Sequence, residues 1–155
     1  MEDQKLRELF EAFCKTVETV FIRDGYAQSI IFVFGANGET VMVPVVEDKK
    51  ATQVAVRMAL VGLKAEALIQ VEEAYVMMVK PGDPMPVNGV KNDPRHVERV
   101  FVVLESRSTT LARSWDIVAD NVVKRYLVRC SGDDNLKVLK TRWAGNWFRR
   151  YDGKA

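Results

Sequence analysis

Two long apolar runs follow one another in the middle of the sequence, and they constrain the fold more than any other feature. The runs are VEEAYVMMVK (residues 71–80) and HVERVFVVLES (residues 96–106), joined by PGDPMPVNGVKNDPR. Their length and β-branched content predict two strands of one hairpin. Loops as long as this one usually bind a partner or lack order. The prolines in the loop restrict its backbone and favour a defined conformation.

The N-terminal part predicts one helix and one short hairpin. Apolar residues repeat at spacings of three and four over residues 3–22, which is typical of an amphipathic helix. Residues 28–34 and 40–46 are β-branched runs on either side of Asn37-Gly38, a dipeptide that favours tight hairpin turns. Pro44 lacks an amide donor, so the second of these strands is expected at a sheet edge.

A second helix is predicted over residues 48–67. Its polar residues trace one narrow stripe, consisting of Lys49, Gln53, Arg57 and Lys64. A helix with so little polar surface is covered on most sides. Either it crosses the sheet beneath the first helix, or part of it meets another subunit. Small residues would allow a close approach: Ala51, Ala55, Ala59 and Gly62.

The C-terminal part predicts further strands, over residues 111–120, 122–130 and 136–143. Short hairpin connections favour a mainly antiparallel sheet. We therefore predict an α+β fold with the order α-β-β-α-β-β-β-β, in which two helices pack on one face of a sheet of about six strands. Residues 1–155 form a single domain, with 143–155 as a loosely held basic and aromatic tail.

The composition limits the class of protein. A chain of 155 residues with 48% hydrophobic and 28% charged residues is typical of one globular domain. Its net charge of +2 is too small to predict a polyanion partner for the whole molecule. Cys14 and Cys130 match no metal or redox spacing, and the charged N-terminus does not resemble a signal peptide. We expect a cytoplasmic protein without a membrane partner.

The central hairpin carries a pattern of its own: Glu73-Ala74-Tyr75, then Asp93-Pro94-Arg95, then Glu98. This pattern resembles a group of small bacterial and phage proteins of uncharacterised function. In that group a Glu-Ala-Trp strand precedes a Pro-x-Arg-x-Glu-like segment and another strand. Tyr75 stands where tryptophan is usual, and Arg-His-Val-Glu spans the arginine-to-glutamate gap. The resemblance covers roughly the middle third of the chain and the preceding helix, and it implies a fold more than an activity.

The first candidate site consists of Glu73, Glu98 and Arg95, with Asp93 beside the arginine. Both glutamates lie on strand faces that are otherwise apolar, where an unpartnered carboxylate is costly. If the hairpin brings them near Arg95, one guanidinium could hold both carboxylates. We favour this ion-pair latch, or a ligand site, over a catalytic pair in which Glu73 or Glu98 acts as a general base.

Metal and cofactor sites are not predicted. His96 is the only histidine, and one histidine cannot supply a three-ligand zinc site. The acids Asp83, Asp93, Glu98 and Asp116 could in principle collect a hard cation, but their spacing matches no known loop. FGANGE lacks the lysine and the following helix of a phosphate-binding loop.

The C-terminal segment offers a nucleic-acid site as an alternative. Basic residues neutralise phosphates and aromatic rings stack on bases. The candidates are Arg142, Trp143, Trp147, Arg149, Arg150 and Tyr151. The competing interpretation, which we favour, is that the aromatics pack against the sheet while the arginines reach the solvent.

The leading functional hypothesis is a non-catalytic binding or assembly module that forms a homodimer or binds another protein. Its basis is an excess of apolar residues, which marks an interface when they are exposed. The loop from Lys80 to Arg95 and the tail from Trp143 to Tyr151 are the expected contact surfaces. Nucleic-acid binding by the tail is the second hypothesis, and a carboxylate-dependent hydrolase is the third.

Overall fold

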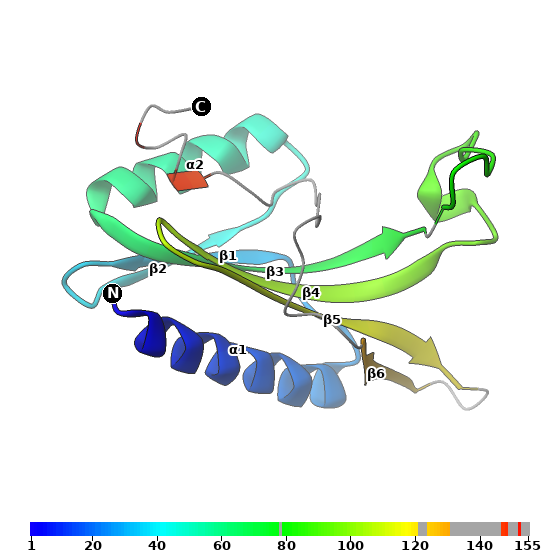
Figure 1. Ribbon diagram of the computed structural model, residues 1–155, viewed down its shortest axis with the longest axis horizontal. Coiled ribbons are helices and arrows are strands. Elements are labelled where there is room, and N and C mark those ends of the chain that lie inside the picture. The colour runs from blue at the N-terminus through cyan, green and yellow to red at the C-terminus, as the bar shows by residue number, and fades with distance from the viewer. Residues whose placement is uncertain (78, 121–123, 131–146, 149–151, 153–155) are drawn as a thin grey trace.

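The computed structural model describes residues 1–77, 79–120, 124–130, 147–148 and 152. The predicted α+β class and order of elements are confirmed (Figure 1). The elements are α1 (Asp3–Asp24), β1 (Ile30–Gly35), β2 (Thr40–Pro44), α2 (Lys49–Gly62), β3 (Ala65–Val76), the 3₁₀ turn η1 (Val90–Asn92), β4 (Val97–Ser106), β5 (Thr110–Ala119) and β6 (Arg125–Arg129).

The six strands form one antiparallel sheet with the order β2-β1-β3-β4-β5-β6. β3 and β4 pair from Ala67↔Ser106 to Val76↔Val97, so the predicted central hairpin is the middle of the sheet. β2 lies at one edge and ends at Pro44, as the missing donor of that proline predicts.

The two helices cover opposite faces of the sheet, whereas the sequence predicted both on one face (Figure 1). β1 shows the reason. Phe32 and Phe34 pack toward α1, while Ile31 and Val33 pack with the buried side of α2. Successive side chains of a strand point to opposite faces, so a strand that is apolar at every position is buried on both sides.

α2 is shorter than predicted, and β3 begins earlier. Asp48 caps α2 by accepting hydrogen bonds from the amides of Lys50 and Ala51. The helix ends at Gly62, and Lys64, with φ of 49°, turns the chain back toward the sheet. Residues 65–67, which the sequence assigned to the helix, instead begin β3, and the strand pairs with β1 and β4.

α1 ends at Gly25 in the left-handed conformation (φ 75°), and its inner face holds Leu6, Phe10, Cys14, Val17 and Phe21. Polar contacts also tie α1 to β5. Glu11 accepts two hydrogen bonds from the buried Arg113 guanidinium, and Glu18 accepts one from the Trp115 indole.

No helix in the described part of the chain is long and apolar enough to cross a membrane.

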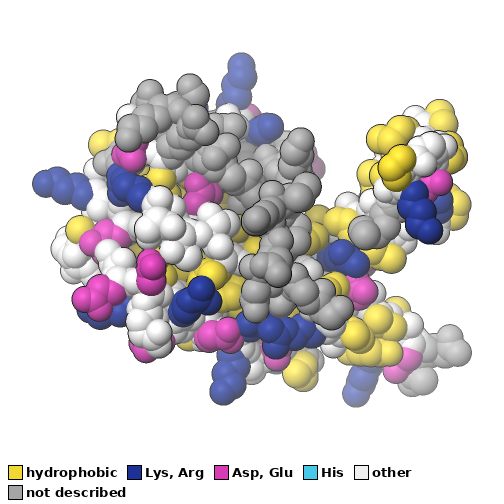
Figure 2. All heavy atoms as spheres, viewed as in Figure 1, with side chains coloured by type: hydrophobic (Ala, Val, Ile, Leu, Met, Phe, Trp, Pro, Cys, Tyr) yellow, Lys and Arg dark blue, Asp and Glu magenta, His cyan; other side chains and the backbone are white. Residues whose placement is uncertain are grey.

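The sheet forks at one end. β4 and β5 pair only as far as Arg99↔Asp116, whereas β3–β4 and β5–β6 pairing continues beyond that point. One prong, which we call the arm, comprises residues 75–77 and 79–97. The other, the β5–β6 prong, comprises residues 117–119 and 124–128. The arm projects from the body, and an open notch separates the two prongs (Figures 1 and 2).

Candidate functional site

A cluster of two glutamates and one arginine joins the prongs at the base of the fork. Glu73 of β3 and Glu98 of β4 lie on the α1 side of the sheet, and both contact one guanidinium, as the sequence predicts. That guanidinium belongs to Arg125 of β6. Its Nη2 donates to Glu73 Oε1 at 2.5 Å and to Glu98 Oε2 at 2.8 Å. The expectation that Arg95 fills this place is wrong.

Further contacts make this cluster, the Arg125 latch, a junction of several elements. Arg125 Nη1 donates to the carbonyl oxygen of Gly25 at the end of α1 (2.9 Å), and the guanidinium lies 5.6 Å from the centre of the Phe21 ring. The amide of Ala27 donates to Glu73 Oε2 at 3.1 Å. Hydrogen bonding to Glu73, with a smaller contribution from Glu98, raises the pKa of Arg125.

The bonding pattern favours a structural latch. Glu73 uses one oxygen for Arg125 and the other for a backbone amide, and both glutamate side chains are only 24% and 35% exposed. A general base needs a carboxylate that can reach a substrate proton, and here the guanidinium occupies that position. The Arg125 guanidinium therefore supplies the charged partner that Glu73 and Glu98 need on strand faces made of valine and leucine.

Arg95 lies in the arm and pairs with Asp93. Its Nε and Nη2 donate to the two carboxylate oxygens at 2.9 Å each, and Nη2 also donates to the carbonyl oxygen of Pro84 at 2.8 Å. The side-chain bonds from Arg95, followed by its backbone amide, lower the pKa of Asp93 to about 2. Arg95 is therefore bonded within the arm, to a residue two positions away in sequence, and not to the glutamates of the sheet.

Other hydrogen bonds hold the rest of the loop in one conformation. Asp83 accepts from the amide of Lys80 at 2.8 Å, and Asn92 donates to the carbonyl oxygen of Asn88 at 2.9 Å. The ring of His96 packs edge-on against Tyr75, with 5.4 Å between centroids. The loop therefore has internal structure, as its prolines predict.

The structured loop exposes apolar side chains instead of burying them. Val87 is 94% exposed and Met85 is 70% exposed, although the proline between them restricts the backbone of Met85. Val79, Tyr75 and Val97 along the arm are each about two-fifths exposed. Figure 2 shows these apolar surfaces on a projection that the body of the molecule does not cover.

A second ion pair lies at the base of the fork on the sheet face opposite α1. Arg99 Nε donates to Asp116 Oδ1 at 2.6 Å, across the last β4–β5 pair. The Cys130 thiol lies 3.6 Å from the same oxygen. The fork is thus bonded on both faces at the point where its prongs separate, which fixes the direction of the arm.

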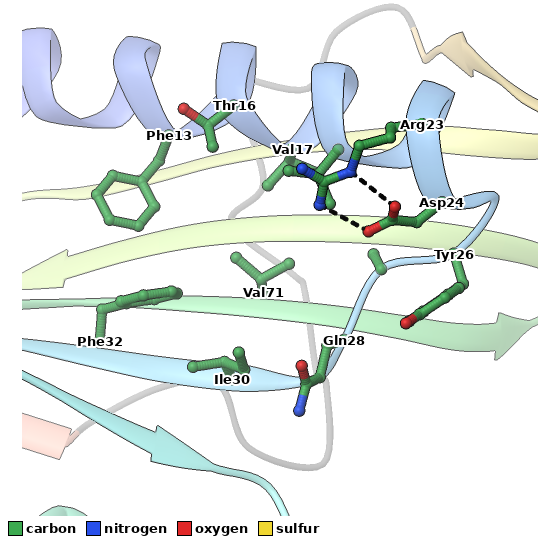
Figure 3. A pocket seen from close by; sticks show the side chains of 12 residues that line it. Phe13, Thr16, Val17, Arg23, Asp24, Tyr26, Gln28, Ile30, Phe32 and Val71 are labelled. Carbon is green, nitrogen blue, oxygen red and sulfur yellow. Dashed lines mark hydrogen bonds and ion pairs between the residues drawn. The ribbon is translucent and has the colours of Figure 1, made fainter.

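A shallow cavity of about 260 Å³ lies between α1 and β1 (Figure 3). Its walls are mainly apolar, with Phe13, Phe32 and Val71 on the inside. Arg23 and Asp24 form a two-bond ion pair at its rim, and the hydrogen bonds from Arg23 lower the pKa of Asp24. Neither glutamate of the Arg125 latch lines this cavity.

The acids considered for a hard cation do not converge. Asp83 caps a turn, Asp93 pairs with Arg95, Glu98 with Arg125, and Asp116 with Arg99. Among the described residues, no group of three or more histidine, cysteine, aspartate or glutamate side chains could hold a metal ion.

The C-terminal segment is described at three residues. Trp147 and Phe148 are each 3% exposed and pack with α2 and β1, so Trp147 does not offer its ring to a base. Asp152 accepts two hydrogen bonds from Arg107 at 2.9 Å each. The other candidates for nucleic-acid binding lie outside the described residues: Arg142, Trp143, Arg149, Arg150 and Tyr151.

Arg125 is the site residue that sequence reasoning missed. It shares its strand face with Leu127, which packs against the core beneath α1. A cation on the inner face of a strand requires an anionic partner, by the same reasoning that singled out Glu73 and Glu98. The alternation in RYLVR was therefore a signal that could have found it.

Comparisons with protein families, with curated proteins and with solved structures give no match. The resemblance of the central hairpin to uncharacterised bacterial and phage proteins thus stays a prediction.

Proposed function

We propose that this protein is a non-catalytic assembly module that forms a homodimer by reciprocal exchange of arms, each arm lying in the fork of the other copy. The observation that carries the proposal is the arm itself. It is a structured projection whose tip exposes Met85 and Val87, and its direction is fixed by ion pairs on both faces of the sheet.

The apolar tip supplies the driving force. Complete burial of a valine or methionine side chain stabilises a complex by roughly 1.5–3 kcal/mol. The internal hydrogen bonds of the loop lower the entropy that binding must remove, because the conformation is already set. An unstructured loop of the same composition would bind more weakly.

The fork supplies a matching surface. Val97 on the arm and Tyr126 and Val128 on the β5–β6 prong are 39%, 45% and 47% exposed. By strand alternation all three belong to the sheet face opposite α1. Tip and fork occur on the same chain, so a two-fold axis allows each copy to give and receive one arm.

The size of the arm is sufficient for a stable dimer. Stable interfaces cover about 800 Å² and roughly 20–30 residues per partner. The segment between the paired ends of β3 and β4, residues 77–96, contains about twenty residues, which is the number found on one side of such an interface. In a reciprocal exchange the fork of each copy adds further area.

The test is the mass of the protein in solution, measured by sedimentation equilibrium over a range of concentrations. We expect a dimer for the natural sequence and a monomer for Val87→Asp and for Tyr126→Asp. The matched control is Ile22→Asp, at an apolar position of α1 that is 81% exposed, on the helix that covers the sheet face opposite to Val97 and Tyr126. This control is expected to remain dimeric.

Mixing the two monomeric variants distinguishes arm exchange from other dimers. The fork of Val87→Asp and the arm tip of Tyr126→Asp both keep their natural residues. A mixed pair can therefore form one of the two arm-to-fork contacts. We expect dimers in the mixture at concentrations where each variant alone is monomeric. A natural protein that is monomeric at about 100 μM, well above the Kd of a standard interface, would refute the proposal.

A further inference from the structure

The outer face of α2 presents a row of apolar side chains to the solvent. Val54, Met58 and Val61 are 55%, 69% and 61% exposed. The opposite side of the same helix is in the core, where Thr52, Val56 and Leu60 are buried. The helix is therefore apolar on two sides, and the described residues bury only one of them.

The spacing of the outer residues is that of a helix–helix seam. Ala51, Val54, Met58 and Val61 succeed one another at intervals of three, four and three residues, which is the a-d-a-d pattern of two heptads. A strip with this spacing faces a second helix along its whole length. Isolated exposed apolar residues on a surface carry no such regularity.

The flanks of this seam differ in charge and size. In the same heptad frame the g positions within α2 are Lys50 and Arg57, and both are basic. The e positions are Ala55 and Gly62, whose small side chains allow a close approach. No acidic residue occurs between positions 49 and 64, so this charge is not balanced within the helix.

The charge pattern decides between possible occupants. In an antiparallel pair of α2 helices from two copies, the basic g rows would face each other and repel. A helix that lies on an anionic bilayer usually carries large apolar residues and basic residues across its polar face, whereas here the cations line one flank only. The basic g positions attract a partner helix that has acidic residues along the matching flank, and this helix buries the apolar outer residues of α2.

We propose that the outer face of α2 is a docking site for an amphipathic helix of another protein, with acidic residues on the flank that meets Lys50 and Arg57. This site is separate from the arm and goes beyond the proposed homodimer. It gives the assembly module a second surface, through which a dimer carries two partner helices.

The probes for a direct test are two synthetic peptides of three heptads with leucine at the a and d positions. One carries glutamate at e and g, the other lysine. Each is labelled with fluorescein and titrated at nanomolar concentration with the full-length protein while anisotropy is measured. We expect the glutamate peptide to bind at least about tenfold more tightly, and its affinity to fall as the salt concentration rises.

Two variants locate the binding. Met58→Glu places a charge in the seam and is expected to weaken the glutamate peptide about tenfold or more. Reversal of the flank in K50E/R57E is expected to transfer the preference to the lysine peptide. Ile22→Glu, at an exposed apolar position on α1, is the control and is expected to bind as the natural protein does. Circular dichroism confirms that each variant is folded.

Four outcomes would overturn the proposal. They are failure of both peptides to bind, equal binding of the two, a charge reversal in K50E/R57E that leaves the preference unchanged, and binding that Met58→Glu does not weaken. If Met58→Glu instead dissociates a dimer that Val87→Asp leaves intact, the seam belongs to a second copy. If it abolishes sedimentation with phosphatidylserine vesicles while neither peptide binds, the seam meets lipid. Failure here leaves the arm-exchange test unaffected.

Discussion

Replacement of Arg125 by methionine tests whether the latch stabilises the fold. The substitution keeps most of the side-chain volume and removes the cation. It leaves Glu73 and Glu98 on one face of adjacent strands without the guanidinium, and it removes the donor to Gly25. The latch therefore changes from an attraction into a repulsion between two carboxylates.

The exposure of the three side chains sets the magnitude. Loss of one partner from a fully buried ion pair costs about 3–5 kcal/mol, whereas exposed pairs contribute about 0–1 kcal/mol. Here the side chains of Arg125, Glu73 and Glu98 are 32%, 24% and 35% exposed, so solvent screens part of the interaction. We expect a loss of about 2 kcal/mol, equivalent to about 4–8 °C in Tm for a domain of this size.

The assay is urea unfolding of four proteins: the natural sequence, Arg125→Met, Glu73→Gln and the double variant. Glu73→Gln alone is expected to cost about 1 kcal/mol, because it weakens one charge-assisted bond. In the Arg125→Met background the same change removes a repulsion, so it should cost nothing or stabilise the protein. The reasoning is refuted if Arg125→Met unfolds within about 0.5 kcal/mol of the natural protein, or if the two changes are additive.

Two further predictions concern the close approach of Gly35 to the end of α2 and the Asp93–Arg95 pair in the arm. A side chain at Gly35 would place Cβ 2.9 Å from the backbone oxygen of Leu63, so Gly35→Ala should lower the free energy of unfolding in urea by about 1–3 kcal/mol. The control is Gly62→Ala, whose Cβ meets nothing within 4 Å and which should lower this free energy much less. The pKa of Asp93 is lowered from 3.8 to about 2, so the bonds from Arg95 persist below pH 3.8 and are lost as the pH falls through about 2. The amide resonance of Arg95, which donates to Asp93, should therefore titrate near pH 2, and a midpoint near 4 would contradict the pairing.

The fold could be predicted from the sequence where the pattern was local. Alternation in the two central runs predicted the β3–β4 pair, and Asn37-Gly38 and Pro44 predicted the turn and the edge strand. The arrangement of helices could not be predicted in the same way, because an apolar residue at every position of β1 is compatible with one or two covered faces until the partners are known.

The candidate site shows the same limit. The sequence indicated that Glu73 and Glu98 need a cation, since carboxylates on apolar strand faces do. It did not indicate which cation, because Arg95 is near in sequence and Arg125 is near only after β6 has joined the sheet. Arg95 is held instead by Asp93, which lies two residues away in sequence.

The two proposed surfaces use parts of the chain that its own core does not need. The inner sides of both helices and both faces of the central strands are buried, so packing already accounts for these apolar residues. The apolar residues exposed at the tip of the arm, on the fork and along the outer side of α2 are not part of this packing. The arm and α2 lie at separate places in Figure 1, so one surface does not block the other. A change in one should therefore leave binding at the other intact: Val87→Asp should abolish the dimer and retain the glutamate peptide, and Met58→Glu should do the reverse.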